Sequence, residues 1–528
     1  MLTLKKVIAR ISAYRTFPVL LLISVNIIIG LVVFDDYGFS YDEPLFYGYA
    51  DAIGYAYTPA NWFSGDFDLT LAYGPSPGDH GNRGPAYILL ARIPAHLLQA
   101  LGLDQASAWH LVNFLVFQIA LYFFFVFCLR WMDSWAALGA TLLMSTQPIL
   151  WGHAFINPKD PPFMLFFLCS LEFGFRMAEK LAHGEPAESM GKTLKYILLP
   201  AVILGLATNI RVLAPLAGVL VGVYFILLGK NLKRIVWFIP YALIAYAVMV
   251  ITWPYLWENP FGKFIQALTF FSYNPTQLRV FFYGEYFRAN ALPLRYLPAI
   301  MLYTLTEPVF IMGGFGLLAA FWRIVKKDIQ WKTLLPTLGW FAVPFIYVLV
   351  KRPPMYDGFR HFLFILPPLF ILAGLTLQVL FKGLQSAWLR TVIIAGLILP
   401  GLIPAVRLHP YEYTYYNQIV GGTSQAAYRF ETDYWLTCYK EAMEEFNSKF
   451  AREYPVLYVD REPYIAGYYA DPRVTIRDFV EEGSAIKDDD YHLLNARLNP
   501  GLQRYRNPAL WALKVGRDNT IFCVIQKQ

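Results

Sequence analysis

Long apolar runs separated by short polar segments dominate this chain. Each run approaches the length of about 20 residues that an α-helix needs to cross a bilayer. The runs lie near residues 17–34, 107–129, 134–152, 161–178, 235–253, 297–321, 333–350, 361–381 and 388–406. The pattern therefore predicts a bundle of membrane-spanning helices.

Two stretches decide how many helices there are. The stretch 194–229 is too long for one span, and Asn209-Ile210-Arg211 and Pro215 interrupt it. We predict two shorter helices there because proline ends or kinks a helix, which gives about eleven spans.

The run 17–34 follows several basic residues, but no small-x-small cleavage site comes after it. We therefore predict a retained first helix instead of a signal peptide.

The distribution of basic residues predicts the orientation. Lys and Arg concentrate in alternate loops, as they do on the cytoplasmic side of membrane proteins, whereas the segments 35–106 and 254–296 are longer and contain more acid. With the N-terminus inside, these two segments are outer loops, and an odd number of spans places residues 407–528 outside as well. We predict a transmembrane domain over 1–406 and a separate outer domain over 407–528.

The polar tail has a different pattern from the rest of the chain. A helical pattern covers about 433–450, and short strand-like runs follow at 455–460, 491–497 and 511–527. Gly516-Arg517-Asp518-Asn519 is typical of a hairpin turn within the last run. The fold class predicted is thus an all-α polytopic membrane domain with a small C-terminal α/β domain. Cys438 and Cys523 both lie in this tail, which leaves one conceivable disulfide.

Composition agrees with a membrane protein and excludes other classes. Hydrophobic residues make up 57% of the chain and charged residues only 15%, well below the roughly one quarter of soluble domains. The net charge is +7, but its cations do not form a basic stripe with interleaved aromatics. Nucleic acid is therefore not an expected partner.

An acidic pair, Asp42 and Glu43, follows the first apolar run directly. A carboxylate at that depth is partly desolvated, which raises its pKa toward the range in which it accepts a proton from a hydroxyl. The alternative is that both acids are solvated loop charges, and composition alone does not decide between the two.

Further ionisable groups stand at the predicted outer ends of other spans. They occur in Asp79-His80-Gly81-Asn82-Arg83, in Asn157-Pro158-Lys159-Asp160, at Asn209 and Arg211, and in Tyr356-Asp357-Gly358-Phe359-Arg360-His361. Ionisable residues at membrane depth are functional by default, although a single arginine there could merely snorkel to the interface. Cations beside a carboxylate suit a reaction with an anionic leaving group, because they stabilise the phosphate charge while the carboxylate activates a hydroxyl.

Other common chemistries have no local support in the sequence. We find no Gly-rich phosphate loop, no paired-His metal motif and no Gly-x-Ser-x-Gly elbow. Nucleotide hydrolysis, zinc proteolysis and serine-hydrolase chemistry are therefore not indicated.

The ordered motifs resemble those of the type C glycosyltransferases that use polyprenyl-phosphate sugars, in the superfamily of protein O-mannosyltransferases and aminoarabinose lipid A transferases. The resemblance rests on the acidic pair, on Asp160-Pro161-Pro162 at the start of a helix, on Arg360-His361-Phe362 with Pro367, and on the outer tail. It covers most of residues 17–406. The family often has a His-Pro-Pro-Leu-x-Lys element after the first loop, where this chain has His80-Gly81-Asn82-Arg83-Gly84-Pro85.

The resemblance implies residue roles. Asp42 would be the general base, Glu43 would organise the loop or a metal, and Asp160 would position donor or acceptor. The donor phosphate would be held by Arg360, with Arg83, Arg211 and Lys159 as further cations. We assign His80, His361 and Tyr356 to the acceptor or the sugar.

The sequence thus predicts an inverting glycosyltransferase in a bacterial inner membrane, with its active site outside the cytoplasm. The partners would be a polyprenyl-phosphate sugar, membrane lipid, and a protein, lipid or glycan acceptor. No cofactor is expected with certainty, and the need for a divalent metal is left open. Two alternatives are a transporter or flippase, which usually shows paired broken helices near the midplane, and a non-catalytic sensor.

Overall fold

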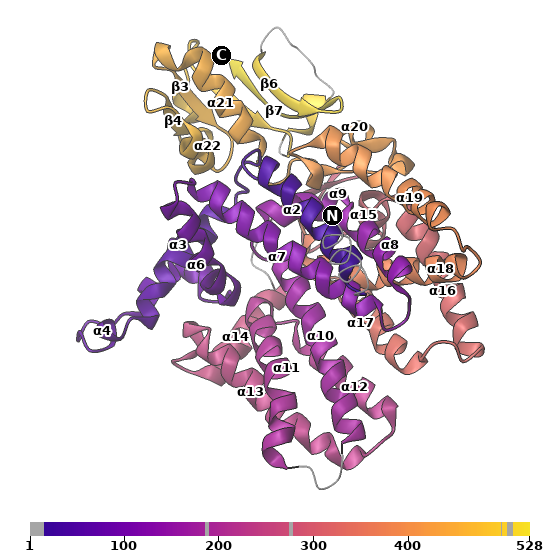
Figure 1. The fold of residues 1–528 in the computed structure, drawn as a ribbon. Helices are drawn as coiled ribbons and strands as arrows, with labels where there is room; N and C mark the ends of the chain where they lie inside the picture. Colours follow the sequence, from indigo (N-terminus) through magenta and orange to yellow (C-terminus); the bar gives the residue numbers. More distant parts are fainter. Residues whose placement is uncertain (1–14, 185–188, 274–277, 498, 504–510) are drawn as a thin grey trace, which may run out of the picture.

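The computed structural model describes residues 15–184, 189–273, 278–497, 499–503 and 511–528. Helices make up most of the molecule, and the strands of the C-terminal region lie together at one end of the helical part (Figure 1).

Six of the described helical segments are long and apolar enough to cross a membrane, judged by length and composition. They are α7 (Gln105–Cys128), α11 (Met190–Ile210), Leu232–Ile251 with α13 (Phe238–Ile251), α16 (Glu307–Val325), α17 (Trp331–Lys351) and α19 (Ala387–Leu408). Shorter apolar helices are α2 (Phe17–Val33), α8 (Ser134–Ser145), α12 (Pro215–Leu228) and α18 (Pro367–Lys382). An integral membrane protein fits this set, while the number of eleven spans stays a prediction.

The break predicted inside 194–229 is present between α11 and α12. Three other runs that the sequence suggests are single helices are interrupted in the structure. The run 134–152 divides into α8 and α9 (Pro148–Ile156), and the run 297–321 divides into α15 (Tyr296–Thr304) and α16. The run 361–381 begins as the 3₁₀ segment η5 (Arg360–Ile365) before α18. In each case the following helix has a proline in its first turn, where proline is tolerated but cannot continue a preceding helix.

The two predicted outer loops contain elements that the sequence analysis did not predict. The first holds α3 (Glu43–Ala52), η1 (Ile53–Tyr57), α4 (Pro59–Trp62), η2 (Leu69–Tyr73), α5 (Pro77–His80) and α6 (Ala86–Ala100). The second holds η4 (Pro254–Leu256), α14 (Pro260–Tyr273) and the hairpin of β1 (Arg279–Phe282) and β2 (Glu285–Arg288). These elements are short or amphipathic, so a search for long apolar runs passes over them.

The C-terminal strands form one five-stranded mixed sheet in the order β4-β3-β5-β7-β6. Strand β3 (Val456–Val459) is parallel to β4 (Thr475–Asp478) and β5 (Tyr491–Asn495), and β7 (Thr520–Lys527) is antiparallel to β5 and β6 (Trp511–Arg517). The helices of this region are α20 (Gly422–Ala426), α21 (Cys438–Phe450), α22 (Pro463–Tyr469) and α23 (Phe479–Glu482).

In the tail, the predicted hairpin turn is confirmed, and the disulfide that the sequence left open is present. Asp518 and Asn519 join β6 to β7, and both have positive φ angles of 47° and 61°, as a two-residue type I′ hairpin turn requires. Cys438 and Cys523 form a disulfide that joins the start of α21 to β7. The division into domains at residue 406 is not tested by these features and stays a prediction.

Helix α10 (Asp160–His183) is the central element that positions the candidate site. It packs against α7, α11, α12 and η5, and most of its side chains are buried. Its N-terminal residue Asp160 therefore lies where η5 and the end of α11 meet. Gly84, just before α6, lies against the backbone of Asn209, since an added Cβ would clash with the Asn209 carbonyl oxygen.

Candidate active site

Asp42 stands at the N-terminus of α3, immediately before Glu43 and Pro44. Its carboxylate is 3.2 Å from Nη1 of Arg360, and its side chain keeps 22% of its surface exposed. Asp42 is thus held by an ion pair and is still accessible to a substrate hydroxyl.

Glu43 points in a different direction from Asp42 and is fully buried. One carboxylate oxygen accepts the Ser40 N–H at 2.6 Å, and the other accepts the Tyr47 hydroxyl at 2.5 Å. Nε2 of His110, on α7, lies 3.0 Å from the second oxygen. These contacts tie the start of α3 to α7, which agrees with an organising role for Glu43 in the loop.

Arg360 begins η5 and is surrounded by three carboxylates. Its guanidinium lies 3.2 Å from Asp42, 3.6 Å from Asp160 and 3.0 Å from Asp357. It also packs on the ring of Trp435 at 4.9 Å. Arg360 therefore joins the N-terminus of α3, α10 and the loop before η5 in one ion network.

Asp160 is oriented by the residues just before α10. The Asn157 side-chain oxygen accepts the backbone N–H groups of Lys159 and Asp160 at 3.0 and 2.9 Å, as an N-cap does. The Asn157 amide also donates to the Asp160 carboxylate at 2.8 Å. Arg211, which follows α11, forms an ion pair with the other oxygen of Asp160.

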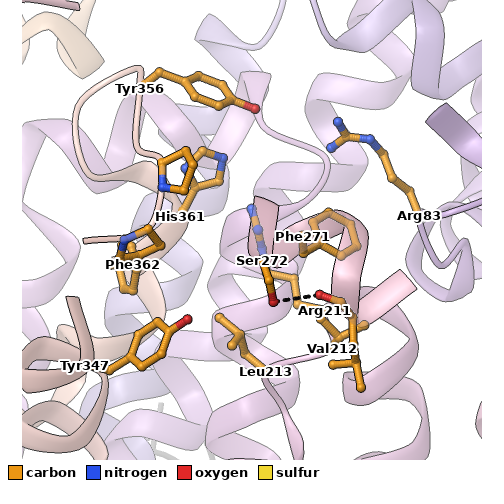
Figure 2. Close-up of a pocket in the computed structure, with 13 residues that line it drawn as sticks. Arg83, Arg211, Val212, Leu213, Phe271, Ser272, Tyr347, Tyr356, His361 and Phe362 are labelled. Atoms are coloured by element: carbon orange, nitrogen blue, oxygen red, sulfur yellow. Dashed lines mark hydrogen bonds between the residues drawn. The ribbon is translucent and has the colours of Figure 1, made fainter. Parts of the chain in front are cut away.

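A group of cations lies beside this network, around a cavity of about 140 Å³ (Figure 2). Arg83 and Arg211 line the cavity together with the apolar or aromatic residues Phe271, Tyr347, Tyr356 and Phe362. The Lys159 Nζ lies 5.4 Å from the ring centre of Phe46 and 5.5 Å from that of Phe271. Three predicted phosphate-binding cations thus gather at one place.

Two cation donors at this place are buried and have no hydrogen-bond partner among the described residues. They are the Lys159 Nζ and the Arg211 Nε. Burial lowers the pKa of Lys159 well below its usual value, and the neighbouring charges of Arg83 and Arg211 lower it further. Buried polar groups are normally hydrogen-bonded, and a bound anion would satisfy both donors and raise the pKa of the lysine.

The three residues predicted to contact acceptor or sugar do not lie together. His361 and Tyr356 both line the cavity, with their rings 5.0 Å apart in an edge-on arrangement. His80 is buried instead, stacks on Tyr49 at 4.8 Å, and contacts the Tyr73 carbonyl oxygen through Nδ1 at 2.7 Å. These contacts place His80 in the packing of the first outer loop.

The sequence analysis assigned no role to several residues of the network. Asp357 is three residues before Arg360, and this spacing could have indicated an ion pair between them. Asn157 stands three residues before Asp160, and asparagine often accepts hydrogen bonds from backbone N–H groups at the start of a helix. Trp435 and Arg497 are contributed by the tail, and no local pattern indicates that they contact Arg360 and Asp357.

The described residues contain no group of three or more His, Cys, Asp or Glu side chains that could hold a metal ion. The acids of the network are each paired with arginine. We therefore derive no step that passes through a metal.

No family model matches the chain, and no curated protein sequence matches it. Solved structures do match. ArnT from Cupriavidus metallidurans, in the apo state, has 15% identity and a TM-score of 0.50 over 95% of this chain and 97% of its own. The same protein bound to undecaprenyl phosphate has the same identity and TM-score, over 96% of this chain.

A second similar structure is the archaeal oligosaccharyltransferase AglB from Archaeoglobus fulgidus, in complex with an inhibitory peptide and a dolichol-phosphate. It has 12% identity and a TM-score of 0.50 over 88% of this chain and 65% of its own. At such identities the likeness concerns the fold. The resemblance seen in the sequence motifs is confirmed at that level, and the chain has the type C glycosyltransferase fold of ArnT and AglB.

Proposed function

We propose that this protein is an inverting glycosyltransferase that moves a sugar from a polyprenyl-phosphate donor to a hydroxyl acceptor. The observation that carries the proposal is a pair of buried donors, the Lys159 Nζ and the Arg211 Nε, that have no hydrogen-bond partner among the described residues and lie beside a cavity. Arg211 pairs with Asp160, and Asp160 lies near Arg360, which pairs with the partly exposed carboxylate of Asp42. Cations aimed at the place where phosphate charge develops are the usual means of stabilising such a leaving group.

The transfer is a single displacement at the anomeric carbon. The acceptor oxygen forms the new bond to this carbon while Asp42 takes the hydroxyl proton. The bond between the anomeric carbon and the phosphate oxygen breaks, and its electron pair leaves with the polyprenyl phosphate. One base suffices for inversion, whereas retention by the glycosidase precedent needs a second carboxylate as nucleophile.

The geometry favours different roles for the four cations. Arg360 already contacts three carboxylates, so we assign it to holding Asp42 and Asp160 in place beside the leaving phosphate. Lys159 and Arg211 have free donors for phosphate oxygens, and Arg83, paired with Asp79 at 2.5 Å, adds positive charge at the cavity wall.

The similar structures support the class of donor. ArnT was crystallised with undecaprenyl phosphate, and AglB was determined with a dolichol-phosphate. Both ligands are polyprenyl phosphates, the class that we propose here as the leaving group. The sugar and the acceptor are not specified by this likeness.

The function is tested by a transfer assay with purified protein in vesicles, supplied with radiolabelled polyprenyl-phosphate sugars and cell-envelope acceptors, together with mass spectrometry of co-purified lipids. Co-purified polyprenyl-phosphate sugar and transfer to a hydroxyl are expected. Movement of the intact lipid-linked sugar across the vesicle membrane without transfer would contradict the proposal and favour a flippase.

We further propose that the site and the C-terminal sheet face the outside of a bacterial inner membrane. In a variant without free cysteines, introduced cysteines at Phe63 and Val480 should react with an impermeant maleimide in intact spheroplasts. Both positions are open, with 86% and 79% of their surface exposed. The positive-inside distribution of cations places both outside.

The matched control for this labelling is Trp388, which is 71% exposed and lies in the first turn of α19, on the predicted inner side. A cysteine there should react only after the membrane is permeabilised. Reaction at position 388 in intact spheroplasts, with none at 63 and 480, would reverse the proposed orientation.

A further inference from the structure

Arg497 comes from the C-terminal sheet and reaches the ion network of the candidate site. It follows β5 by two residues and is 4% exposed. Its Nη2 lies 2.6 Å from Oδ1 of Asp357, and its Nη1 donates to the Tyr434 carbonyl oxygen at 2.5 Å. The guanidinium also lies over the ring of Tyr41, 5.5 Å from its centre.

Asp357 connects Arg497 with Arg360. It is fully buried, and its second oxygen accepts from the Tyr41 hydroxyl at 2.8 Å and from the Trp435 indole at 3.2 Å, while Arg360 approaches to 3.0 Å. Burial raises the pKa of Asp357, but Arg497 and Arg360 outweigh it, so the pKa lies below its usual value. Asp357 is therefore an ionised group shared by two arginines.

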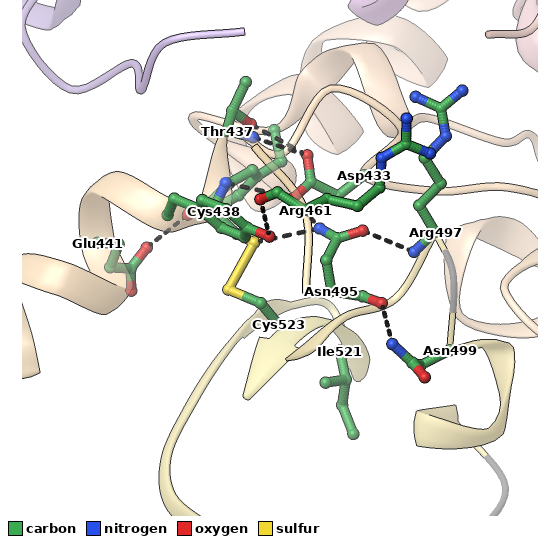
Figure 3. The surroundings of a disulfide bond; sticks show 12 residues. Asp433, Thr437, Cys438, Glu441, Arg461, Asn495, Arg497, Asn499, Ile521 and Cys523 are labelled. Carbon is green, nitrogen blue, oxygen red and sulfur yellow. Dashed lines mark hydrogen bonds between the residues drawn. A yellow bond between two sulfur atoms is a disulfide. The ribbon is translucent and has the colours of Figure 1, made fainter. Parts of the chain in front are cut away.

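A group of residues around the disulfide holds the backbone of Arg497 (Figure 3). We call this group the disulfide corner, and it consists of Asp433, Thr437, Cys438, Asn495 and Cys523. Asn495 ends β5, opposite Cys523, and its side-chain oxygen accepts the Arg497 N–H at 2.7 Å. The Asn495 amide donates to Asp433 at 3.0 Å, and Asp433 accepts the Cys438 N–H at 3.2 Å. The disulfide corner therefore fixes the orientation of the Arg497 backbone.

We propose that Arg497 is a positioning residue of the site. It fixes Asp357, and through Asp357 it fixes the Arg360 guanidinium against Asp42. This inference rests on the proposed transferase function. Without Arg497, Asp357 would keep only one cationic partner, and Arg360 would be drawn toward the uncompensated carboxylate and away from Asp42. The C-terminal sheet then completes the active site in addition to covering it.

Loss of Arg497 should affect the transfer rate more than the affinity for the donor. The donor phosphate is assigned to Lys159 and Arg211, which do not contact Arg497, so donor affinity should change little. A shift of about 1 Å in a catalytic group costs on the order of 10²-fold in rate. We therefore expect Arg497→Gln to lower kcat by roughly 10- to 100-fold, with KM for the donor within about 3-fold of the wild type.

The test measures kcat and KM for the wild type, Arg497→Gln, Arg497→Lys, Asp357→Asn and the double variant, with melting temperatures for all. Arg497→Lys keeps the charge and should recover part of kcat. The double variant should be no slower than the slower single variant, because coupled residues are not additive. Arg473→Gln is the matched control, as Arg473 is exposed and paired with Asp471 in the same region.

The outcomes separate the two proposals. If the wild type is active and kcat is unchanged in Arg497→Gln, the positioning role is wrong and the transferase function still holds. A fall in kcat that only follows the loss of folded protein, without recovery in Arg497→Lys, would also overturn it. Wild-type protein that binds the lipid-linked sugar but transfers nothing would overturn both proposals.

Discussion

Asp42→Asn should lower the transfer rate by roughly 10² to 10⁴-fold, the range attributed to general-base catalysis. The change keeps the shape of the side chain but removes the proton acceptor. Donor binding should persist, because the proposed phosphate contacts lie on Lys159 and Arg211. The measurement is single-turnover transfer in reconstituted vesicles, with donor binding measured separately on the same preparation.

Glu43→Gln is the informative comparison for this variant, since the two acids are adjacent in the sequence. Glu43 is buried and contacts Ser40, Tyr47 and His110, so its substitution should lower the melting temperature and affect chemistry less. Unchanged transfer in Asp42→Asn would disprove the assigned base. A joint loss of transfer and donor binding would show that Asp42 is structural.

Lys159→Met should weaken donor binding without weakening the fold. The Nζ has no hydrogen-bond partner among the described residues, whereas in the proposed complex it forms a charge-assisted contact with phosphate. Such contacts contribute about 1.5–3 kcal/mol, so the Kd for the polyprenyl phosphate should rise roughly 10- to 150-fold. Because a buried amino group without a hydrogen-bond partner costs free energy whether or not it is protonated, the melting temperature should stay the same or rise.

Weaker donor binding together with an unchanged or higher melting temperature distinguishes a ligand-binding lysine from a structural one. Lys263→Met is a suitable control, since Lys263 also lies over an aromatic ring but is paired with Glu258 and does not line the cavity. Titration of fluorescent polyprenyl phosphate and a melting curve complete the measurement. If Lys159→Met bound the donor as well as the wild type, the phosphate site would have to be placed elsewhere.

Local patterns in the sequence were sufficient for several features. The apolar runs predicted most of the long helices, and the interruption at Pro215 separated α11 from α12 as found. The turn at Asp518 and Asn519 was predictable because few residue types accept positive φ. The disulfide was the only pairing open to the two tail cysteines.

Other features depended on contacts between distant residues. Whether Asp42 or Glu43 faces the site is set by the direction in which α3 starts and by its packing on α7, which places His110 beside Glu43. The sequence suggested that Arg360 holds the donor phosphate, whereas the structure surrounds it with Asp42, Asp160 and Asp357. Its partners lie on segments far apart in the chain.

By itself, the sequence determined what each segment can do, because hydropathy, proline, capping residues and turn residues act over a few neighbours. It determined most of the long helices, the break before Pro215, one turn and the chemical types available for a site. Only the tertiary structure decided which charges meet. The ion pair between Arg497 and Asp357 spans 140 positions, and it forms because the disulfide corner and the end of β5 direct the Arg497 side chain toward Asp357.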